Sequence, residues 1–449
     1  MEATRYNKKL MHLTWPIFLE SFLRMFLGNV NVLMLSKYSD KAVGAVGISN
    51  QIVSMVLVMY GIVSAGTAII VSQYIGAKQR ETAAKVANIS LLLNLVFGII
   101  LSLAMALFAR PILKVMNTPE DLIAYAYIYI VIVGAASFTQ ALMAAISAVA
   151  RSFGHTKFPM YVALTVNALN IAGNYISIFR PFGIPSIGVT GIAVSVAFSQ
   201  VVGVILSLAM YRKIGIEFKL KDFVPFPKDT MKAVLKVGVP AAGEYMSYNF
   251  SQMATTYIVT MFGAAAITTK VYAQNFTFFA STVGSAIGLG TQILVGQMAG
   301  AGKKDKAYKI GLNSVKIGIT ANVIIALIFM LFRRPLMSIF TKDPGIVELA
   351  SLILVIDIFV EAGRALNNVV GNSLRGAGDV RFPVIISIIS MWGVSVALCY
   401  ILGIQLKLGL IGVWIAFAAD ECIRGLILLW RWRSKAWQKI DIIKAKVTA

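Results

Sequence analysis

Six acidic side chains lie inside long apolar stretches of the sequence, where ionised groups are rare: Glu20, Glu244, Asp357, Glu361, Asp420 and Glu421. An ionisable residue in such a stretch is costly and is a functional candidate by default. Neighbouring carboxylates disfavour simultaneous ionisation and can share a proton. With nearby carbonyl and hydroxyl oxygens they can also hold Na⁺. The residue types therefore predict sites for H⁺ or Na⁺.

Position along the expected helices separates these acids. At about 1.5 Å per residue, Glu244 and Asp420 lie about 15 Å, and Glu361 about 18 Å, from the inner ends of their helices. Glu244 has no Lys or Arg within one turn of its own helix, which makes it the strongest candidate for the coupling ion. Glu20 lies near an expected helix start, where an acid also complements the helix dipole.

The remaining acids have basic neighbours at helical spacing. Asp357 and Glu361 are four residues apart and share one helix face. Arg364 lies three residues after Glu361, so a neutralising pair and a coupling site both fit, and Asp357 is placed to share the same arginine. Asp420 and Arg424 are four apart, the spacing of a structural ion pair.

The composition indicates a membrane protein. The chain has 449 residues, of which 58% are apolar and 13% charged, whereas a soluble domain has about 25% charged residues. Apolar runs of about 20 residues, long enough to span a bilayer, recur along the chain. We expect an all-α polytopic protein with twelve spans, at 13–35, 44–75, 88–109, 122–150, 158–179, 187–210, 234–262, 266–298, 312–332, 345–373, 382–403 and 408–430.

The net charge of +22 does not indicate a nucleic-acid partner, because the basic residues lie in short loops. On alternating sides, the loops and termini hold 28 and 10 Lys and Arg residues, and the richer side is expected to be cytoplasmic. Both termini are therefore expected on the cytoplasmic side of a cell membrane. The polar segment MEATRYNKKLMH is not expected to be a cleavable signal peptide. His12, His155, Cys399 and Cys422 are too scattered for a metal cluster or a disulfide framework, and no catalytic constellation indicates an enzyme.

The sequence repeats itself after 224 residues. GTAIIVSQYIGAKQ from Gly66 aligns with GTQILVGQMAGAGK from Gly290, and RSFGHTKFP at 151–159 aligns with RGAGDVRFP at 375–383. Glu20 aligns with Glu244. An even number of spans in each copy predicts two parallel six-helix lobes around a central cleft. The expected lobes are 1–210 and 234–449, with a cytoplasmic linker at 211–233 and a short basic tail.

The repeated nine-residue segments read mainly as cytoplasmic turns between the fourth and fifth helix of each lobe. Their Gly allows a tight helix end, and their Pro sits in the first turn of the next helix. The copies of Asp357 and Glu361 in the first lobe are Val133 and Ser137. Coupling chemistry is therefore expected in the second lobe.

These motifs resemble the multidrug and toxic compound extrusion (MATE) family. The resemblance rests on QYIGA and QMAGA, SFGHTKFPM, NALNIAGNYISIF, VGVPAAGE and EAGRALNNVVGNSLRGAGDVRFP, which follow one another along nearly the whole chain. It implies a twelve-helix, two-lobed fold. It also implies alternating-access efflux of bulky, often cationic organic compounds, driven by inward flow of H⁺ or Na⁺, without a further cofactor.

The sequence departs from two patterns of that family. The DinF-like branch carries acids in the first and fifth helices, where this chain has Asn31 and Asn174. The NorM-like branch carries an Asp eleven residues before the arginine of LRG, where this chain has Arg364, with Glu361 one turn earlier. The coupling-ion candidates are therefore Glu244, Glu361, Asp357 and Glu20, with a possible Na⁺ at Glu244, Asp357 and Glu361.

Polar and aromatic residues near helix ends are candidates to line the cleft, although a role in the core or toward lipid fits each of them as well. They are Asn50, Gln51, Asn170, Asn174, Asn249, Gln274, Asn275, Met34, Tyr60 and Phe278. The expected partners are small organic cations and membrane lipids, with no nucleic acid, and the expected state is a monomer.

A second interpretation keeps the two lobes but moves lipid-linked saccharides, as flippases do. Such a protein needs a cationic cleft for pyrophosphate. Only three basic residues, Arg24, Arg364 and Arg424, are counted inside the spans, against six acids. This count favours a cationic cargo.

The charge bias predicts the topology. Cysteines introduced in the linker at 220–230 should resist labelling from outside intact cells, whereas one near Lys342 should react. The reverse pattern would contradict cytoplasmic termini.

Overall fold

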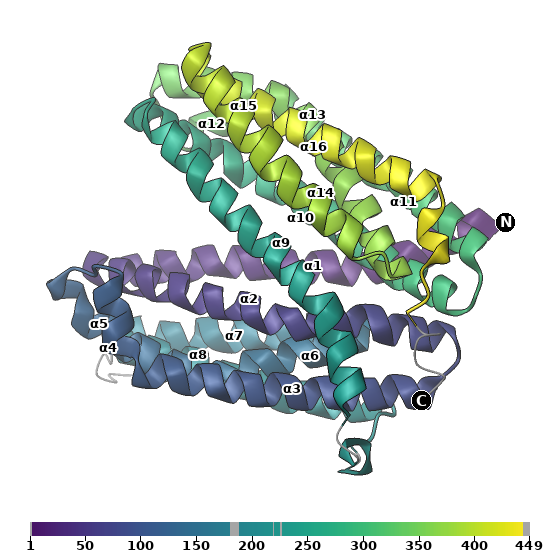
Figure 1. Ribbon diagram of the computed structural model, residues 1–449. Helices are drawn as coiled ribbons and strands as arrows, with labels where there is room; N and C mark the ends of the chain where they lie inside the picture. The colour runs from purple at the N-terminus through teal and green to yellow at the C-terminus, as the bar shows by residue number, and fades with distance from the viewer. Residues whose placement is uncertain (1, 180–187, 219, 225–226, 443–449) are drawn as a thin grey trace. The chain divides into compact units, whose positions relative to one another are not determined.

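The computed structural model describes residues 2–179, 188–218, 220–224 and 227–442, and this part of the chain is helical without a strand. Parts of the expected linker (219 and 225–226) and of the basic tail (443–449) lie outside the described residues. The helices of the first repeat (Figure 1) are α1 (Glu2–Ser36), α2 (Asp40–Gly76), α3 (Arg80–Leu107), α4 (Ala109–Val115), α5 (Glu120–Ala135), α6 (Phe138–Ser152), α7 (Lys157–Phe179) and α8 (Gly188–Lys213).

The second repeat follows the same order after a short 3₁₀ turn at Leu220–Phe223. Two π-helical segments, Met391–Val396 and Ile401–Gln405, interrupt its eleventh expected span. Its helices are α9 (Lys228–Thr260), α10 (Ala264–Gly300), α11 (Lys304–Leu331), α12 (Arg333–Ser338), α13 (Pro344–Ala377), α14 (Arg381–Ser390), α15 (Ala397–Tyr400) and α16 (Gly409–Arg433).

Each expected span coincides with a helix or with consecutive helical segments of the described chain. By length and hydropathy, 8 helices of the described residues can cross a membrane, or 9 if α5 and α6, bent by 45°, form one span. The other expected spans are α9, α13 and α16, whose ionisable residues lower their hydropathy. The protein is therefore an all-α, multi-pass membrane protein.

The chain packs into two units that do not follow the repeat boundaries at every helix. The C-terminal unit comprises Met1–Phe18, Ser72–Lys78 and Gly243–Ala449, and the N-terminal unit comprises Leu19–Val71 and Gln79–Ala242. Helices α1 and α9 thus each contribute their first part to one unit and their second part to the other. We call these two the crossing helices.

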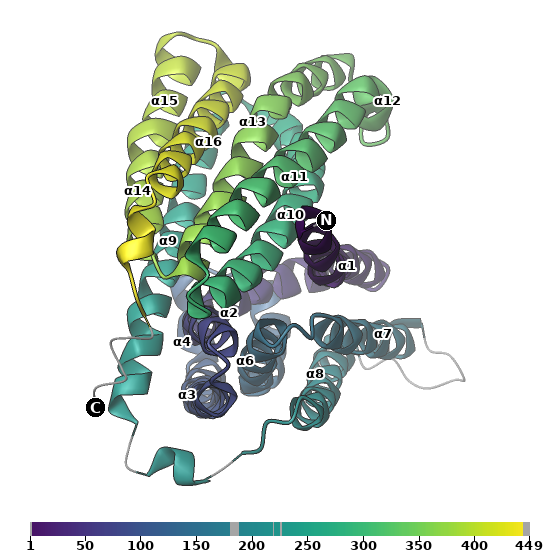
Figure 2. The ribbon, with the colours of Figure 1, turned by 90° about the vertical axis from the view of Figure 1, so that its right-hand side faces the viewer.

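The C-terminal unit is built around α10, α13 and α16, which pack side by side, with α11 against α10 and α13 (Figure 2). Leu10, Leu13 and Ile17 of α1 join this core. Large apolar side chains of the same helices, such as Trp430 and Phe359, remain exposed, which suits a protein whose surroundings are lipid.

The N-terminal unit contains α3 packed against α5 and α6, and α8 packed against α5, α6 and α7. The start of the linker lies on α3. Asn88 accepts a hydrogen bond from the Tyr211 hydroxyl and donates to the Glu217 carbonyl, and Arg80 donates to the Ile214 carbonyl. The linker therefore begins as an ordered part of this unit.

The turn chemistry expected for the repeated nine-residue segments is confirmed. Gly154 and Gly378 follow the ends of α6 and α13 with φ of 90° and 105°, a left-handed conformation that favours glycine. Pro159 and Pro383 lie in the first turns of α7 and α14.

The paired motifs QYIGA and QMAGA pack against each other within the C-terminal unit. A Cβ atom on Gly76 would lie 1.9 Å from the Gln297 carbonyl oxygen, and one on Gly300 would lie 1.9 Å from that of Gln73. Only glycine permits this approach of two helix backbones, so the repeated glycines set the spacing between the ends of α2 and α10.

Gly76→Ala and Gly300→Ala should each destabilise the protein, by about 1–3 kcal/mol, because the backbones must separate. Gly61→Ala is the matched control on α2, where an added Cβ meets nothing within 4 Å. Thermal unfolding of purified protein measures the effect. Equal melting temperatures for Gly76→Ala and Gly61→Ala would contradict this packing.

Candidate functional site: a buried charge network in the C-terminal unit

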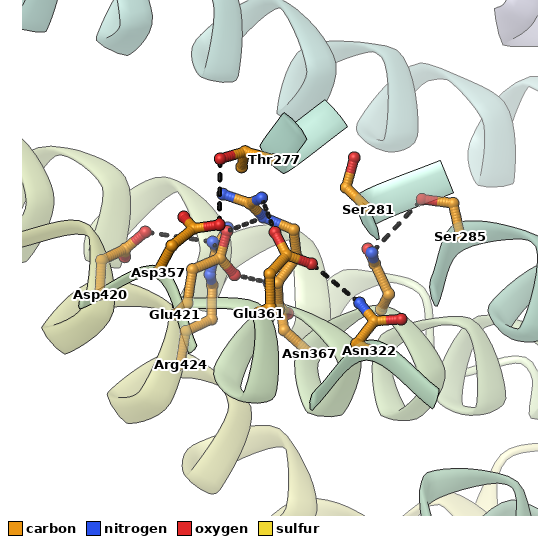
Figure 3. Close-up of polar contacts among 12 residues, drawn as sticks. Thr277, Ser281, Ser285, Asn322, Asp357, Glu361, Asn367, Asp420, Glu421 and Arg424 are labelled. Carbon is orange, nitrogen blue, oxygen red and sulfur yellow. Dashed lines mark hydrogen bonds and ion pairs between the residues drawn. The ribbon is translucent and has the colours of Figure 1, made fainter. Parts of the chain in front are cut away.

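Three of the six acids in the apolar helices pair with two arginines between α13 and α16, and a fourth acid, Asp357, lies beside them (Figure 3). Helix α13 supplies Asp357, Glu361 and Arg364, while α16 supplies the other two acids and the second arginine. The charge network is defined as Asp357, Glu361, Arg364, Asp420, Glu421 and Arg424.

Arg364 connects the two helices. Its Nη1 contacts Glu361, the pairing expected from the three-residue spacing, and its Nε lies 3.3 Å from Glu421 Oε1 on α16. Two side-chain amides also donate hydrogen bonds to these carboxylates: Asn322 Nδ2 donates to Glu361 at 2.9 Å, and Asn367 Nδ2 donates to Glu421 at 2.9 Å. Glu361 is fully buried, so each of these contacts replaces water.

Arg424 continues the network along α16. Its Nη2 lies 3.1 Å from Asp420 Oδ2, the expected intrahelical pair, and 2.9 Å from Glu421 Oε2. The Ser390 hydroxyl donates to the other oxygen of Asp420. Ser390 ends α14 immediately before a π-helical segment, a distortion that is frequent at functional sites.

Asp357 differs from the other three acids, because its hydrogen-bond partners are neutral. Trp414 Nε1 donates to Oδ1 at 3.2 Å, and the Thr277 hydroxyl lies 3.1 Å from Oδ2. The residue is 2% exposed. The suggestion that Asp357 shares Arg364 with Glu361 finds no support among the ion pairs of the described residues.

The network therefore contains four carboxylates and two guanidinium groups. If all six were ionised, two negative charges would remain uncompensated in the apolar interior. Each uncompensated buried charge costs several kcal/mol, so full ionisation of all four carboxylates is disfavoured. Within the described residues, no group of three or more His, Cys, Asp or Glu side chains is arranged to hold a metal ion.

The corresponding positions of the N-terminal unit carry no charge. An offset of 224 places Val133, Ser137 and Gln140 opposite the three network residues of α13, and the offset of 221 that aligns α8 with α16 places Ser199, Gln200 and Gly203 opposite those of α16. The repeat therefore retains the helices and confines the charges to one copy.

A glycine makes room for the amide that binds Glu361. Gly284 of α10 corresponds to Tyr60 of α2, and a Cβ on Gly284 would lie 2.8 Å from Asn322 Nδ2. In the N-terminal unit, Tyr60 fills the equivalent space, and its hydroxyl lies 2.9 Å from Ser137 Oγ, at the position of Glu361. A tyrosine–serine contact in one copy thus replaces the asparagine–glutamate contact of the other.

Glu244 and Glu20 lie outside the network, in two ion pairs of the same kind. Glu244 Oε2 lies 2.6 Å from Arg375 Nη2, and Glu20 Oε1 lies 2.8 Å from Arg151 Nη2. Glu20 also contacts the exposed Arg24. The expectation that Glu20 lies near a helix start is wrong, because α1 begins at Glu2.

The predicted cleft residues of the N-terminal unit are divided between surface and core. Asn50 and Gln51 are exposed, and Asn50 accepts a hydrogen bond from Tyr129. Asn174 is buried and donates to Asn31 at 3.0 Å and to Asn170 at 3.2 Å. Tyr60 is buried, and Met34 is half-buried against the core.

The predicted cleft residues of the C-terminal unit lie mostly at the surface. Asn249, Asn275 and Phe278 are exposed, and Gln274 is half-buried. The amides of Asn249 and Asn275 each donate to a carbonyl four residues earlier on their own helix.

The count of basic residues inside the spans must be corrected. Lys236, Lys270 and Lys316 also lie within the expected spans, in α9, α10 and α11, and Arg151 and Arg375 lie just beyond two of them, within α6 and α13. Lys270 is buried and donates to the Thr256 hydroxyl at 2.6 Å. The acid excess is therefore a local property of the charge network rather than of the spans as a whole.

The MatE family model matches residues 16–176 and 240–401, two segments that start 224 residues apart. The chain belongs to the MATE family. Its members are transporters and not enzymes, and the repeat found in the sequence is therefore the repeat of the family.

Relatives and solved structures agree with this assignment. The chain is 42% identical to the uncharacterized transporter YisQ of Bacillus subtilis over 95% of this chain and 94% of the relative, and 30% identical to the probable multidrug resistance protein NorM of Thermotoga maritima over 98% and 95%. The crystal structure of the MATE transporter VcmN from Vibrio cholerae in its bent form matches with a TM-score of 0.89 at 20% identity, over 97% of this chain and 98% of that chain.

Removing one arginine of the network should leave a carboxylate without its partner. We expect Arg364→Gln to destabilise this MATE protein by about 3–5 kcal/mol, the cost of breaking a buried ion pair. Adding Glu361→Gln should restore much of that loss, because it removes the unpaired charge. Thermal unfolding compares both with Arg334→Gln, an exposed arginine of the same unit. An Arg364→Gln protein as stable as this control would contradict the network.

Proposed function

We propose that this chain exports bulky organic cations in exchange for protons, and that the charge network holds the protons. The observation that carries the proposal is the imbalance of four buried carboxylates against two arginines. Proton uptake by the network restores charge balance, and proton release leaves a negative interior that attracts a cationic compound. Alternating occupancy by proton and compound couples the two fluxes.

The surroundings of Asp357 favour a proton over Na⁺. A protonated Asp357 can donate through Oδ2 to Thr277, whose hydroxyl then donates to the Ala273 carbonyl at 3.3 Å, while Trp414 Nε1 still donates to Oδ1. A metal cation needs oxygen acceptors, whereas the indole N–H is only a donor. Asp357 is therefore the proposed first proton carrier, and Glu361, on the same helix face, is the second.

Glu244 and Glu20, which the sequence also offers as coupling sites, are each matched by an arginine from another helix. Their charges are balanced without an ion, so we assign coupling to the network instead.

The cargo class is supported by the relatives, several of which are named probable multidrug resistance proteins. The flippase alternative requires free positive charge for pyrophosphate. In the described helices, Arg24, Arg151, Arg364, Arg375 and Arg424 are all in ion pairs. The buried Lys270 donates to the Thr256 hydroxyl instead, but it is a single charge, fewer than a pyrophosphate needs, which disfavours that alternative. The transporter is proposed to act in the cell membrane as a monomer, with both termini in the cytoplasm.

Uptake of ethidium into inverted vesicles tests the proposal. Under an imposed pH gradient the wild type should accumulate ethidium, and an imposed Na⁺ gradient alone should not drive uptake. Asp357→Asn and Glu361→Gln should each lose gradient-driven uptake by about tenfold or more, as expected for groups that act in every cycle. Asp305→Asn, an exposed acid of the same unit, is the control.

Two results would contradict the proposal. Uptake that follows the Na⁺ gradient alone would assign the coupling to Na⁺. Full proton-driven uptake by both Asp357→Asn and Glu361→Gln, at protein levels equal to those of Asp305→Asn, would show that the network is structural.

A further inference from the structure

The ion pairs of Glu20 and Glu244 form a symmetric set. Glu20 and Glu244 are 224 residues apart, and so are Arg151 and Arg375. Both glutamates contact their arginines at 2.6–2.8 Å, and both glutamate side chains are at most 14% exposed. The repeat has thus kept two opposite charges and the contact between them, although the charge network was not kept in both copies.

Each glutamate lies where its helix passes from one packing unit to the other. Helix α1 changes unit between Phe18 and Leu19, and α9 changes unit between Ala242 and Gly243. We call these two places the crossing points. Glu20 and Glu244 are the second residues after them, and each pairs with an arginine of the unit that the helix has just entered.

Before the crossing point, each helix packs closely on a glycine of the unit that it is leaving. A Cβ on Gly66 would lie 2.2 Å from the Val234 carbonyl oxygen of α9, and a Cβ on Gly290 would lie 2.7 Å from the Thr14 hydroxyl of α1. Gly66 and Gly290 are repeat partners. The first part of each crossing helix therefore packs closely on a glycine, and its second part begins with an ion pair.

Between these two attachments each helix contains a proline. Pro16 lies within α1 and Pro240 within α9, each four residues before its glutamate. Proline removes one helix hydrogen bond and clashes with the preceding turn, so the helix is weakest just before the ion pair. A helix that bends easily at its proline follows the movement of both units only if the segment before the proline and the segment after it are each attached to a unit.

We propose that Glu20–Arg151 and Glu244–Arg375 are positioning ion pairs that fasten the crossing helices to the units they enter, so that movement of a unit is transmitted to its helix during transport. The proposal requires that the chain is a transporter, which its family shows. It does not require coupling to protons or a role for the charge network.

The ion pairs have testable consequences for local order. Neutralising one partner, as in Glu244→Gln or Arg375→Gln, leaves the other charge buried and unpaired, so each single variant should be less stable than the double variant. Hydrogen exchange should accelerate in the helix segment that follows the crossing point, at 243–260, and not in the equivalent segment of α1. Glu20→Gln should give the mirror result at 19–36.

Charge exchange separates an ion pair from a carboxylate that carries ions. Glu244→Arg combined with Arg375→Glu, and Glu20→Arg combined with Arg151→Glu, should restore slow exchange and most of the ethidium transport rate. In the single variants that rate should fall by about tenfold, while ethidium binding to the purified protein changes by less than about twofold. Arg24→Gln is the control, because Arg24 is 72% exposed and its repeat position is Tyr248.

Additive destabilisation by the two neutral substitutions, or unchanged hydrogen exchange in Glu244→Gln and Glu20→Gln, overturns the proposal. A charge-exchanged protein that is folded, shows slow exchange and still fails to transport also overturns it, in favour of an ion-carrying Glu244. Failure of proton-driven ethidium uptake in the wild type concerns the proposed function alone, because the unfolding and exchange measurements need no substrate.

Discussion

Burial of unequal numbers of opposite charges is the constraint on which the C-terminal unit depends. Arg364 and Arg424 pair with three carboxylates between α13 and α16, and the fourth, Asp357, is buried beside them. An unpaired charge is expensive in such an interior. The surrounding polar groups belong to α10, α11, α14 and α16, and each donates a hydrogen bond to an acid: Thr277, Asn322, Ser390 and Trp414. Five helices therefore contribute to one buried cluster, in which the carboxylates outnumber the guanidinium groups by two.

The duplicated fold shows which features serve the scaffold and which are specific to one copy. The glycines that bring helices together, the turns at Gly154 and Gly378, and the two Glu–Arg pairs occur in both repeats. The charge network occurs in one, because Val133 and Ser137 stand at the positions of Asp357 and Glu361. The pair Tyr60 and Gly284 shows what the network requires of its surroundings. The Asn322 amide that binds Glu361 occupies space beside Gly284, and a tyrosine at this position of the second repeat would fill that space.

Much of the fold could be predicted from the sequence, since hydropathy and the repeat each act over many residues. The ion pairs Glu361–Arg364 and Asp420–Arg424, whose partners are three and four residues apart on one helix, were also predictable from helix geometry. The partners of Asp357 and Glu244 were not, because they come from helices 57 to 131 residues away. A signal for Arg375 was nevertheless present. The repeated segments RSFGHTKFP and RGAGDVRFP begin with Arg151 and Arg375, and Glu20 and Glu244 are also repeat partners. Because both an arginine and a glutamate recur in the two copies, the sequence contained a signal for an ion pair between them, which the interpretation of these segments as turns did not use.

Proton release on binding of an organic cation tests the central claim most directly. Purified protein in weakly buffered detergent solution is mixed with ethidium, and the pH change is recorded together with the bound ethidium. The account predicts that the wild type releases protons in proportion to the ethidium bound. The double variant Asp357→Asn with Glu361→Gln should release no protons, whether or not it still binds ethidium. Ethidium binding by the wild type without proton release, or unchanged release by the double variant, would contradict the assignment of the proton site to the charge network.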